Sequence, residues 1–444
     1  MKKSFLSAIF CFALLLAGCS KHQSSVSYPR IFRAWSGIED TIFKGNETEN
    51  YAKHDLCFGS ISGLLGLEWQ LDDSIKYEGL ATKISEKNLQ AATDRKAELL
   101  KLNPRMLLLA TIEYRDAYYG SGKDSEKVDF PPDSPFWLRD SSNNVVIGWA
   151  EDTNVDGVID RKDDTPWGLA DFTNEKFQDI LADKALAVKN TGLFEGIFLD
   201  WWKERGATAY DIMEPGSGPV LSDILELAAR INILKKIREK TGNDFLILVN
   251  ANYDTIPLSA PYVNGAFMEC YRDDFMHGYT TEEIHKMETS LAWHERNLKK
   301  PVINCLEGWR VVQKYDDDPK TRFAERNNEE NKRSMRMITS LGLTHSDGYV
   351  LFSDPNELPC GDHLHNWYDF WDAQLGSPVS PKSVKYENTD GLYIREFDNG
   401  WVVYNNSGSE KEITLPGKAT GLTSRLSGTR HRLPNLDGEI YLRN

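Results

Sequence analysis

The sequence lacks the motifs that mark several common classes of enzyme. It has no HExxH pair for a zinc hydrolase, no GxSxG turn for a serine hydrolase, and no glycine-rich phosphate loop after its first apolar run. It also lacks an excess of basic residues, because 52 Lys and Arg stand against 67 Asp and Glu, a net charge of −15. That balance excludes nucleic acid as a partner and disfavours electrostatic docking on anionic lipid, whereas neutral and cationic ligands remain open.

Cysteine is scarce as well, with six residues in the whole chain and no CxxC pair. An oxidising compartment would permit a disulfide, but most of the cysteines beyond the N-terminal segment lie in apolar, strand-like runs, and we expect buried free thiols. Their spacing does not indicate a zinc site. The four cysteines beyond the N-terminal segment are Cys57, Cys270, Cys305 and Cys360.

The N-terminus has the pattern of an export signal. Lys2 and Lys3 precede an apolar run, Phe5–Leu16, that is too short to span a membrane as a mature helix. The tetrad Leu-Ala-Gly-Cys that ends at Cys19 resembles the lipobox of bacterial lipoproteins, in which the cysteine is lipidated. A plain secretory signal with an incidental cysteine is the alternative. We therefore predict a signal peptide over residues 1–19, a flexible tether over 20–29, and a lipid-anchored protein of the bacterial cell envelope.

Eight short apolar runs recur along the next 350 residues or so, separated by longer amphipathic stretches. Near-continuous apolar strands are typical of a parallel sheet that is buried on both faces. The pattern predicts an α/β fold, a (β/α)₈ TIM barrel over residues 30–379, with a doubly wound open sheet as the alternative. The runs are Arg30–Gly37, Asp55–Ile61, Arg105–Tyr114, Glu195–Trp202, Phe245–Tyr253, Gly265–Tyr271, Pro301–Gly308 and Gly348–Asp354.

The stretches between these runs predict helices, with one exception. Only residues 254–264 separate the fifth run from the sixth, and they include two prolines, so a full crossover helix does not fit there. Either that helix is missing or the number of strands is wrong by one. The predicted helices include Glu175–Lys189, Ser222–Lys240, Glu282–Lys299 and Asn327–Leu341.

The chain changes character after residue 380. Short β-type runs alternate with turn sequences such as Asp398-Asn399-Gly400, which predicts a small antiparallel β-sandwich over 380–444. We interpret it as a packing module in preference to an independent sugar-binding domain. Its predicted strands are Leu392–Phe397, Trp401–Asn405, Glu412–Leu415, Leu422–Leu426 and Glu439–Leu442.

Acidic residues stand at the ends of several apolar runs. Active sites of TIM barrels lie at the C-terminal ends of the strands, and a carboxylate after four or five apolar residues is costly to bury without a partner or a purpose. Glycosidic hydrolysis needs two carboxyl groups. We predict Asp200, which ends the fourth run, as nucleophile or stabiliser and Glu269, which ends the sixth, as general acid/base, with Glu307 as the substitute. Each carboxylate could instead form a salt bridge or cap a turn.

Other polar and aromatic residues at the strand ends are predicted to bind substrate. Flat aromatic rings can stack on sugar faces, although packing in the core explains any one of them equally well. The predicted substrate-binding residues are Trp35, Glu113, Trp201, Trp202, Asn250, Asn252, Tyr271, Glu307, Trp309 and Asp354.

Several of these segments carry a family resemblance. The segments GIFLDWW, WGLADFTNEKFQDILADKA, GAFMECY and PVINCLEGW resemble the hypothetical glycosyl-hydrolase-like group 15, and the tail GLYIREFDNGWVVYNNSG is similar to a familiar closing β-domain. More distantly, the pattern is similar to α-galactosidase and polygalactosaminidase barrels. In those families an Asp at strand four and an acidic residue at strand six carry the reaction, which implies the same roles for Asp200 and Glu269. The resemblance covers about residues 30–440 and implies a reaction class without a substrate.

Residues 152–163 match the pattern of a calcium-binding loop. Oxygen-bearing residues occupy positions one, three, five, nine and twelve, and Gly157 occupies position six, where such a loop turns sharply. Asp in place of Glu at position twelve resembles dockerin and other bacterial loops. A solvated acidic loop is the alternative. We predict a structural Ca²⁺ bound by Asp152, Asn154, Asp156, Asp160 and Asp163, and by the carbonyl of Val158.

The sequence therefore favours an envelope-anchored, monomeric glycoside hydrolase that acts on an oligo- or polysaccharide. A non-catalytic lipoprotein that binds glycans is the second hypothesis, since binding needs only aromatic surfaces and hydrogen bonds. A purely structural envelope protein is the third, and it leaves the acidic strand ends unexplained. The sugar, the linkage and the stereochemical outcome are left open.

Overall fold

The computed structural model describes most of the chain beyond the N-terminal segment. The described residues are 27–39, 43–120, 128–151, 165–204, 221–270, 279–312, 326–357 and 363–444, together with 321 and 324. Within them no helix is long and apolar enough to cross a membrane.

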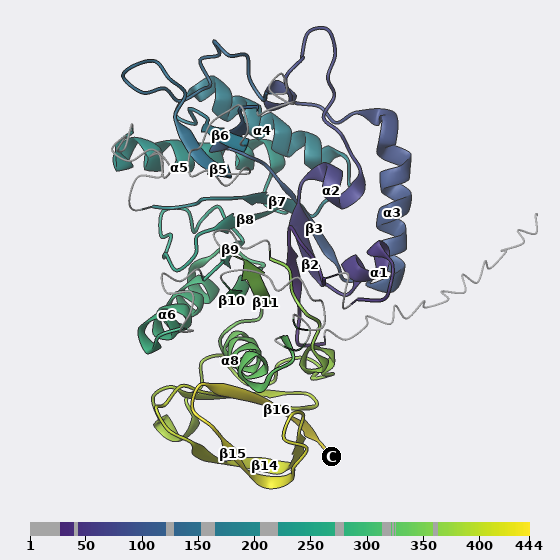
Figure 1. Cartoon of the computed structure of the whole chain (residues 1–444), viewed down its shortest axis with the longest axis vertical. Helices are drawn as coiled ribbons and strands as arrows, with labels where there is room; N and C mark the ends of the chain where they lie inside the picture. Colours follow the sequence, from purple (N-terminus) through teal and green to yellow (C-terminus); the bar gives the residue numbers. More distant parts are fainter. Residues whose placement is uncertain are drawn as a thin grey trace, which may run out of the picture.

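Eight parallel strands form a nearly closed barrel in which neighbours in the chain are neighbours in space (Figure 1). A parallel bridge between Ile31 and Val350 joins the first strand region to the last. Each of the eight predicted runs overlaps a strand, so the predicted barrel is confirmed and the open sheet is excluded. The strands are β1 (Phe32–Ala34), β2 (Leu56–Gly59), β3 (Leu107–Thr111), β7 (Gly196–Leu199), β8 (Leu246–Asn250), β9 (Gly265–Met268), β10 (Cys305–Val312) and β11 (Tyr349–Glu357).

Helices surround these strands, and polar side chains cap the longest ones. Asn174 accepts a hydrogen bond at the start of α4, and Thr280 forms a capping box with Glu283 at the start of α6. Turns alone connect β8 to β9, as the short link predicted. The α-helices are α1 (Glu47–Ala52), α2 (Ile61–Leu65), α3 (Leu89–Leu102), α4 (Glu175–Asn190), α5 (Asp223–Thr241), α6 (Thr281–Asn297) and α8 (Glu329–His345). Short 3₁₀ helices span Glu78–Leu80, Glu86–Asn88, Asp369–Asp372 and Tyr386–Asn388.

Four phenylalanines fill the barrel interior below its C-terminal rim. Phe32, Phe58, Phe198 and Phe267 come from four different strands, and each is almost fully buried. The ring centroids of Phe58 and Phe198 lie 4.3 Å apart, and those of Phe58 and Phe267 lie 5.2 Å apart. Burying each ring contributes about 1.5–3 kcal/mol. This aromatic layer is the floor of the site described below.

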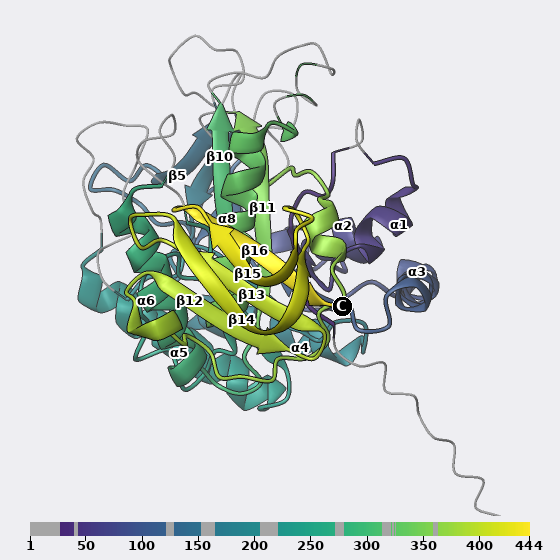
Figure 2. The same cartoon turned by 90° about the horizontal axis from the view of Figure 1, so that it is seen from below.

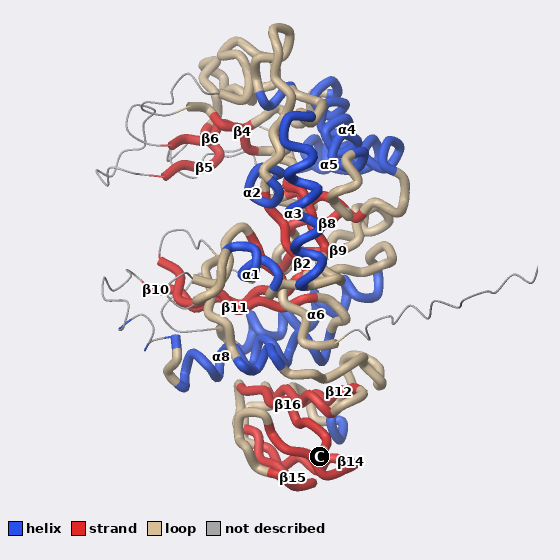
Figure 3. Tube along the Cα trace, turned by 90° about the vertical axis from the view of Figure 1, so that its right-hand side faces the viewer, coloured by secondary structure: helices blue, strands red, loops and turns tan. Residues whose placement is uncertain are grey.

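A three-stranded antiparallel sheet is inserted between β3 and α4. It consists of β4 (Asp116–Tyr118), β6 (Thr165–Leu169) and β5 (Ile147–Glu151), in that order across the sheet. The calcium-loop pattern was expected in this part of the chain, but a sheet was not. Glu151 pairs with Thr165, so this antiparallel pair flanks the segment with the calcium-loop pattern. Figure 3 shows this sheet at the opposite end of the molecule from the C-terminal sheet.

The C-terminal residues form the predicted antiparallel domain, as a single five-stranded sheet. Trp401, Val403 and Tyr441 belong to its own small core. Residues 422–426 are not the predicted strand: β14 continues to Gly421 and the chain then turns. The strands are β12 (Leu392–Phe397), β13 (Gly400–Asn405), β14 (Lys411–Gly421), β15 (Ser427–Leu433) and β16 (Asp437–Arg443), in the order β12-β13-β16-β14-β15.

Helix α8 joins this sheet to the barrel. It packs against β10 and β11 on one side and against β13 and β16 on the other (Figure 2). Arg336 donates two 2.9 Å hydrogen bonds to the carboxylate of Asp437. Gly438 passes so close to Ser340 that a Cβ atom there would meet its side chain at 2.2 Å. The sheet is thus fixed to the barrel by a paired charge and a close backbone contact.

The cysteines of the described strands match the expectation. Cys57, Cys270 and Cys305 are buried free thiols. Burial raises the pKa of the Cys57 thiol to about 12, so it is inert as a nucleophile. Cys360 lies outside the described residues.

Candidate active site

Two carboxylates and one amide from three neighbouring strands meet at the C-terminal rim of the barrel. Asp200 follows β7, Asn250 ends β8 and Glu269 follows β9. The side-chain nitrogen of Asn250 donates a 2.8 Å hydrogen bond to Asp200 Oδ1 and another of 2.8 Å to Glu269 Oε2. Because both oxygens contact one nitrogen, they lie no more than about 5.6 Å apart, within the range in which two carboxyl groups act on one glycosidic bond.

The backbone leaves these strands in an unusual conformation. Trp35, Trp201, Asn252 and Cys270 follow β1, β7, β8 and β9, and their φ angles are 46°, 52°, 49° and 48°. Residues with side chains rarely adopt this left-handed region, and such residues gather at functional sites. At Trp201 the turn brings the backbone N–H within 2.9 Å of Asp200 Oδ1, to which it donates a hydrogen bond. The same strand ends that carry the two carboxylates are therefore locally strained.

The surroundings of the two carboxylates separate their protonation behaviour. Desolvation raises the pKa of Glu269 to about 7, the His363 cation opposes this rise, and the nearby Asp200 and Glu307 add to it. Desolvation also raises the pKa of Asp200, but the hydrogen bonds from Asn250 and from the Trp201 N–H act against it. Glu269 is thus the better proton donor near neutral pH, and Asp200 has the more strongly stabilised anion.

Glu307 occupies a different position from the one the sequence suggested. Its side chain is completely buried, with no exposed surface. His363 Nδ1 lies 3.0 Å from both carboxylate oxygens, and the Ser353 hydroxyl donates a hydrogen bond to one of them. Glu307 is therefore committed to a histidine inside the protein, and it is neither a substitute catalytic group nor a substrate contact.

His363 is the residue that the sequence analysis missed. It stacks on Trp35 with ring centroids 4.8 Å apart and meets the ring of Trp309 edge-on at 5.2 Å. Burial alone would lower its pKa, but Glu307, together with Glu269 and Asp200, raises it to about 9. The available signal was the triplet His363-Leu364-His365 shortly after the last strand, the only HxH pattern in the chain.

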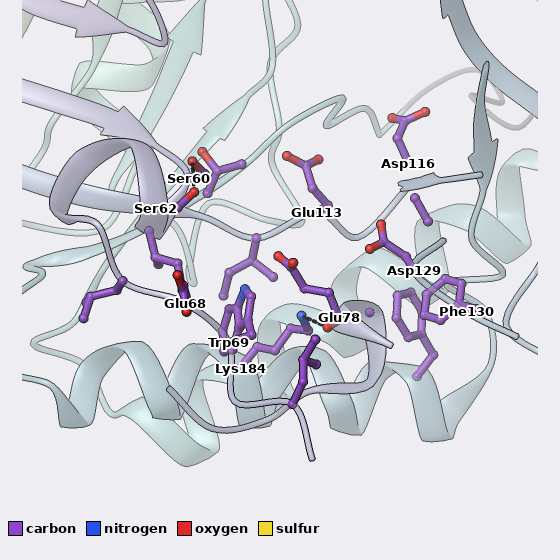
Figure 4. A pocket seen from close by; sticks show the side chains of 18 residues that line it. Ser60, Ser62, Glu68, Trp69, Glu78, Glu113, Asp116, Asp129, Phe130 and Lys184 are labelled. Carbon is purple, nitrogen blue, oxygen red and sulfur yellow. Dashed lines mark hydrogen bonds between the residues drawn. The ribbon is translucent and has the colours of Figure 1, made fainter. Parts of the chain in front are cut away.

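Glu113 lies close to Asp200 and lines a cavity of about 320 Å³ (Figure 4). Its side chain is exposed and opens on the cavity. Desolvation, followed by the charges of Asp200, Asp116 and Asp129, raises its pKa to about 8. Because Ile112 N–H donates to the carbonyl of Phe198 across β3 and β7, Glu113 lies at the level of Asp200. Glu113 therefore belongs both to the cavity wall and to the strand-end level of Asp200.

The cavity itself combines aromatic and charged walls. Lys184 is nearly buried: its ammonium lies 4.1 Å from the centre of the Trp69 ring and donates a 2.9 Å hydrogen bond to the carbonyl of Glu78. Desolvation lowers the pKa of Lys184 to about 8 and raises that of Asp129 to about 6. In Figure 4 the carboxylates of Glu78, Glu113 and Asp129 surround the same space.

Besides Glu307, three more of the predicted substrate-binding residues are in the protein interior, which corrects their assignment. Trp202 is fully buried and donates from its indole nitrogen to the Ser259 hydroxyl. Trp309 is also buried, behind His363. Asp354 is fully buried and accepts hydrogen bonds from Tyr368 and Asn331. Their burial leaves none of the three available to a sugar, and the sequence pattern does not reveal it.

Trp35, Trp201 and Asn252 are partly exposed near the pair. Arg115 lies over the Trp201 ring at 4.4 Å, which leaves the opposite face of that ring as the one a sugar could use. Tyr271, Cys19 and all the predicted calcium ligands lie outside the described residues. Among the residues that are described, no group of three or more His, Cys, Asp or Glu could hold a metal ion.

Several solved structures are distantly similar to this chain. No curated protein matches the sequence. An α-amylase from Malbranchea cinnamomea is 11% identical, with a TM-score of 0.49 and coverage of 93% of this chain and 96% of that one. An α-galactosidase from Thermus thermophilus is 13% identical (TM-score 0.38; 74% and 59% covered). The glycoside hydrolase domain of PelA from Pseudomonas aeruginosa is 9% identical (TM-score 0.40; 73% and 95%). These distant similarities carry no inference about substrate.

A family model gives the closer assignment. The model of hypothetical glycosyl hydrolase family 15 matches residues 101–401, which include β3 to β11, the inserted sheet and the start of the C-terminal sheet. Both Asp200 and Glu269 fall within the match. Because the match spans more than half of the chain, this protein belongs to hypothetical glycosyl hydrolase family 15.

Proposed function

We propose that this protein hydrolyses a glycosidic bond in an oligo- or polysaccharide by a retaining, two-carboxylate mechanism. The observation that carries the proposal is the Asn250 amide shared by Asp200 and Glu269, which limits their oxygens to about 5.6 Å. Retaining enzymes separate their carboxyl groups by about 5–5.5 Å, whereas inverting enzymes leave about 6.5–9.5 Å for a water molecule.

In the proposed reaction Glu269 begins protonated and Asp200 begins ionised. Glu269 transfers its proton to the glycosidic oxygen as the bond to the anomeric carbon breaks, and Asp200 attacks that carbon to form a glycosyl ester. Glu269, now a carboxylate, takes a proton from water, and the resulting hydroxide displaces Asp200. Both carboxyl groups return to their starting states. Asn250 donates to both groups and so holds them in register.

The substrate has a natural path beside these residues. Glu113, which lies near Asp200, lines the cavity together with Trp69. A sugar unit in this cavity would meet an aromatic face together with carboxyl groups that can donate or accept hydrogen bonds. We propose that the cavity binds a sugar unit adjacent to the bond that is cleaved.

The function is tested with protein that lacks residues 1–19 and a broad panel of glycans and aryl glycosides. Proton NMR of the first product formed gives its anomeric configuration. Turnover with retention supports the proposal, and turnover with inversion contradicts the assigned mechanism. Tight glycan binding without turnover, unaffected by Asp200→Asn, would favour the non-catalytic glycan-binding protein instead.

We also propose a structural Ca²⁺ in residues 152–163, between the paired strands β5 and β6. A bound ion stabilises the folded state by mass action, so chelation is expected to lower the melting temperature by several degrees. Asp156→Ala with Asp160→Ala should melt at the same temperature with and without chelator. Asp133→Asn, an exposed carboxylate of the same insertion, should respond as the wild type does. If the melting temperature of the wild type is the same with and without Ca²⁺, the proposal is contradicted.

The N-terminal segment is proposed to attach the protein to the cell envelope through lipid on Cys19. Expressed in a bacterium with an alkyne fatty acid, the wild type is expected to incorporate the label and to sediment with membranes. Cys19→Ala should lose both properties. Cys11→Ala, in the preceding apolar run, is the matched control and should retain them. Labelling of the Cys19→Ala variant would contradict lipidation at this position.

A further inference from the structure

One charged residue at the site has no part in the proposed reaction. His363 is only 6% exposed, and its Nδ1 lies 3.0 Å from both oxygens of the fully buried Glu307. The Ser353 hydroxyl donates to the same carboxylate. Since Nδ1 faces Glu307, the other ring nitrogen points away from it, and among the described residues none accepts a hydrogen bond from that nitrogen. Such an ion pair inside a protein needs a reason, because desolvating two charges is costly.

We propose that His363 is a positively charged positioning residue for the catalytic pair. Glu307 and Ser353 fix its ring against Trp35, where its charge stabilises the ionised form of Asp200 and limits how tightly Glu269 holds its proton. The roles of Asp200 and Glu269 in the reaction rest on the proposed function. The ion pair of His363 with Glu307, and the effect of the His363 charge on the two carboxyl groups, do not.

The aromatic layer below the rim places His363 at the height of the two carboxylates. Phe198 and Phe267 each lie two residues before a catalytic carboxylate, and residues two apart on a strand share a face about 7 Å apart. Trp35 packs edge-on against both phenylalanines, with centroids 5.5 and 6.1 Å away. His363 stacks on Trp35 at 4.8 Å and lies 6.1 Å from Phe267. It therefore belongs to the next layer, as Asp200 and Glu269 do.

Three acids among the described residues favour the protonated form of His363. Asp200 follows β7, Glu269 follows β9 and Glu307 lies on β10, and each of these acids raises the pKa of His363. In return, the His363 charge lowers the pKa of both Asp200 and Glu269. Trp35, which follows β1, and Ser353 on β11 carry no charge. His365, two residues along, is neutral, because burial lowers its pKa to about 3.

The first measurement concerns the protonation of His363 itself. Ordinary histidines are neutral at pH 8, so nitrogen-detected NMR of ¹⁵N-histidine protein at that pH is expected to contain one persistent imidazolium. In Glu307→Gln this signal should become neutral by pH 7, because burial is no longer opposed by a contacting carboxylate. Absence of any imidazolium at pH 8 in the unaltered protein overturns the proposal, and this measurement requires no variant to fold.

The second measurement follows the Asp200 carboxyl in protein labelled with ¹³C-aspartate, with its signal identified from the Asp200→Asn spectrum. In His363→Asn the titration midpoint of Asp200 is expected to rise by about one to two pH units, and His363→Lys should reverse at least half of this rise. His365→Asn removes a neutral histidine from the same segment and should leave the midpoint unchanged. An unmoved midpoint in His363→Asn, or an equal rise in His365→Asn, overturns the proposal.

These titrations need no substrate, so they separate the two ideas. Shifted midpoints in a protein that hydrolyses no glycan would retain the role of His363 in the charge balance and contradict the proposed function. Turnover of a glycan with unshifted midpoints would support the proposed function and contradict the role of His363. If an active substrate is found, the acid side of the pH profile gives a further readout. There the activity of His363→Asn relative to the wild type should fall about tenfold for each pH unit by which the Asp200 midpoint has risen.

Discussion

Asp200→Asn is expected to reduce kcat/KM by about 10⁴-fold or more while the protein stays folded. Removal of an attacking group prevents the covalent step, and losses of this size are typical for a nucleophile. The asparagine has nearly the same shape and can still accept hydrogen bonds from Asn250 and from the Trp201 N–H through its amide oxygen. Rates with an aryl glycoside found in the panel, together with circular dichroism and the melting temperature, measure the effect.

Asp183→Asn is the matched control for this variant. Asp183 is exposed on α4, where it pairs with Lys240, and surface pairs contribute little to stability. We expect its activity to stay within about twofold of the wild type, because it touches neither the site nor the core. Azide should partly restore turnover in Asp200→Asn and yield a glycosyl azide of inverted configuration. Full activity in a folded Asp200→Asn protein would remove Asp200 from the mechanism.

Glu269→Gln is expected to have an effect that depends on the leaving group. Glycosides with poor leaving groups need the proton, so Glu269→Gln should hydrolyse them about 10²–10⁴-fold more slowly than the wild type does. Dinitrophenyl glycosides leave without it, so their first step should remain fast and a glycosyl-enzyme intermediate should accumulate, visible by mass spectrometry. Azide should then release a product of retained configuration, since it needs no deprotonation.

The pH profile gives an independent test of the same residue. Glu269 must be protonated to act as an acid and has a pKa of about 7, so wild-type activity should fall as the pH rises through that value. Asp200 must be ionised, so activity should also fall at low pH. Glu269→Gln should lack the alkaline fall. Glu282→Gln, exposed on α6, should keep it. Equal losses for all leaving groups would contradict the acid role.

The barrel could be predicted because its strands are apolar on both faces. After its first residue, a run such as EGIFLDWW has no polar residue until the strand ends. One run therefore predicts a buried parallel strand, the position of its end and the first residue at the rim. The inserted sheet could not be predicted in the same way. Its strands, such as Asp116–Tyr118 and Thr165–Leu169, are short and mixed in polarity, and they pair with each other across 50 residues of insertion.

The site was predictable only where strand order decides proximity. Asp200, Asn250 and Glu269 end three consecutive strands, and consecutive strands of a barrel are neighbours. His363 lies beyond β11, outside any helix or strand, and the position of such a residue depends on tertiary contacts that have no local sequence pattern. For the same reason Glu307 seemed available, although its partner is 56 residues further along the chain.

The closure of the barrel has a consequence for how the protein is made. The Tyr28 hydroxyl donates to the carbonyl of Asp347, 319 residues later, next to the bridge between Ile31 and Val350. A growing chain therefore holds an open sheet with two bare edges until almost all of the barrel has been synthesised, and contacts of such long range form slowly. Under the proposed export this delay would be useful, because a chain whose barrel is still open could be threaded through a translocation channel before the barrel closes.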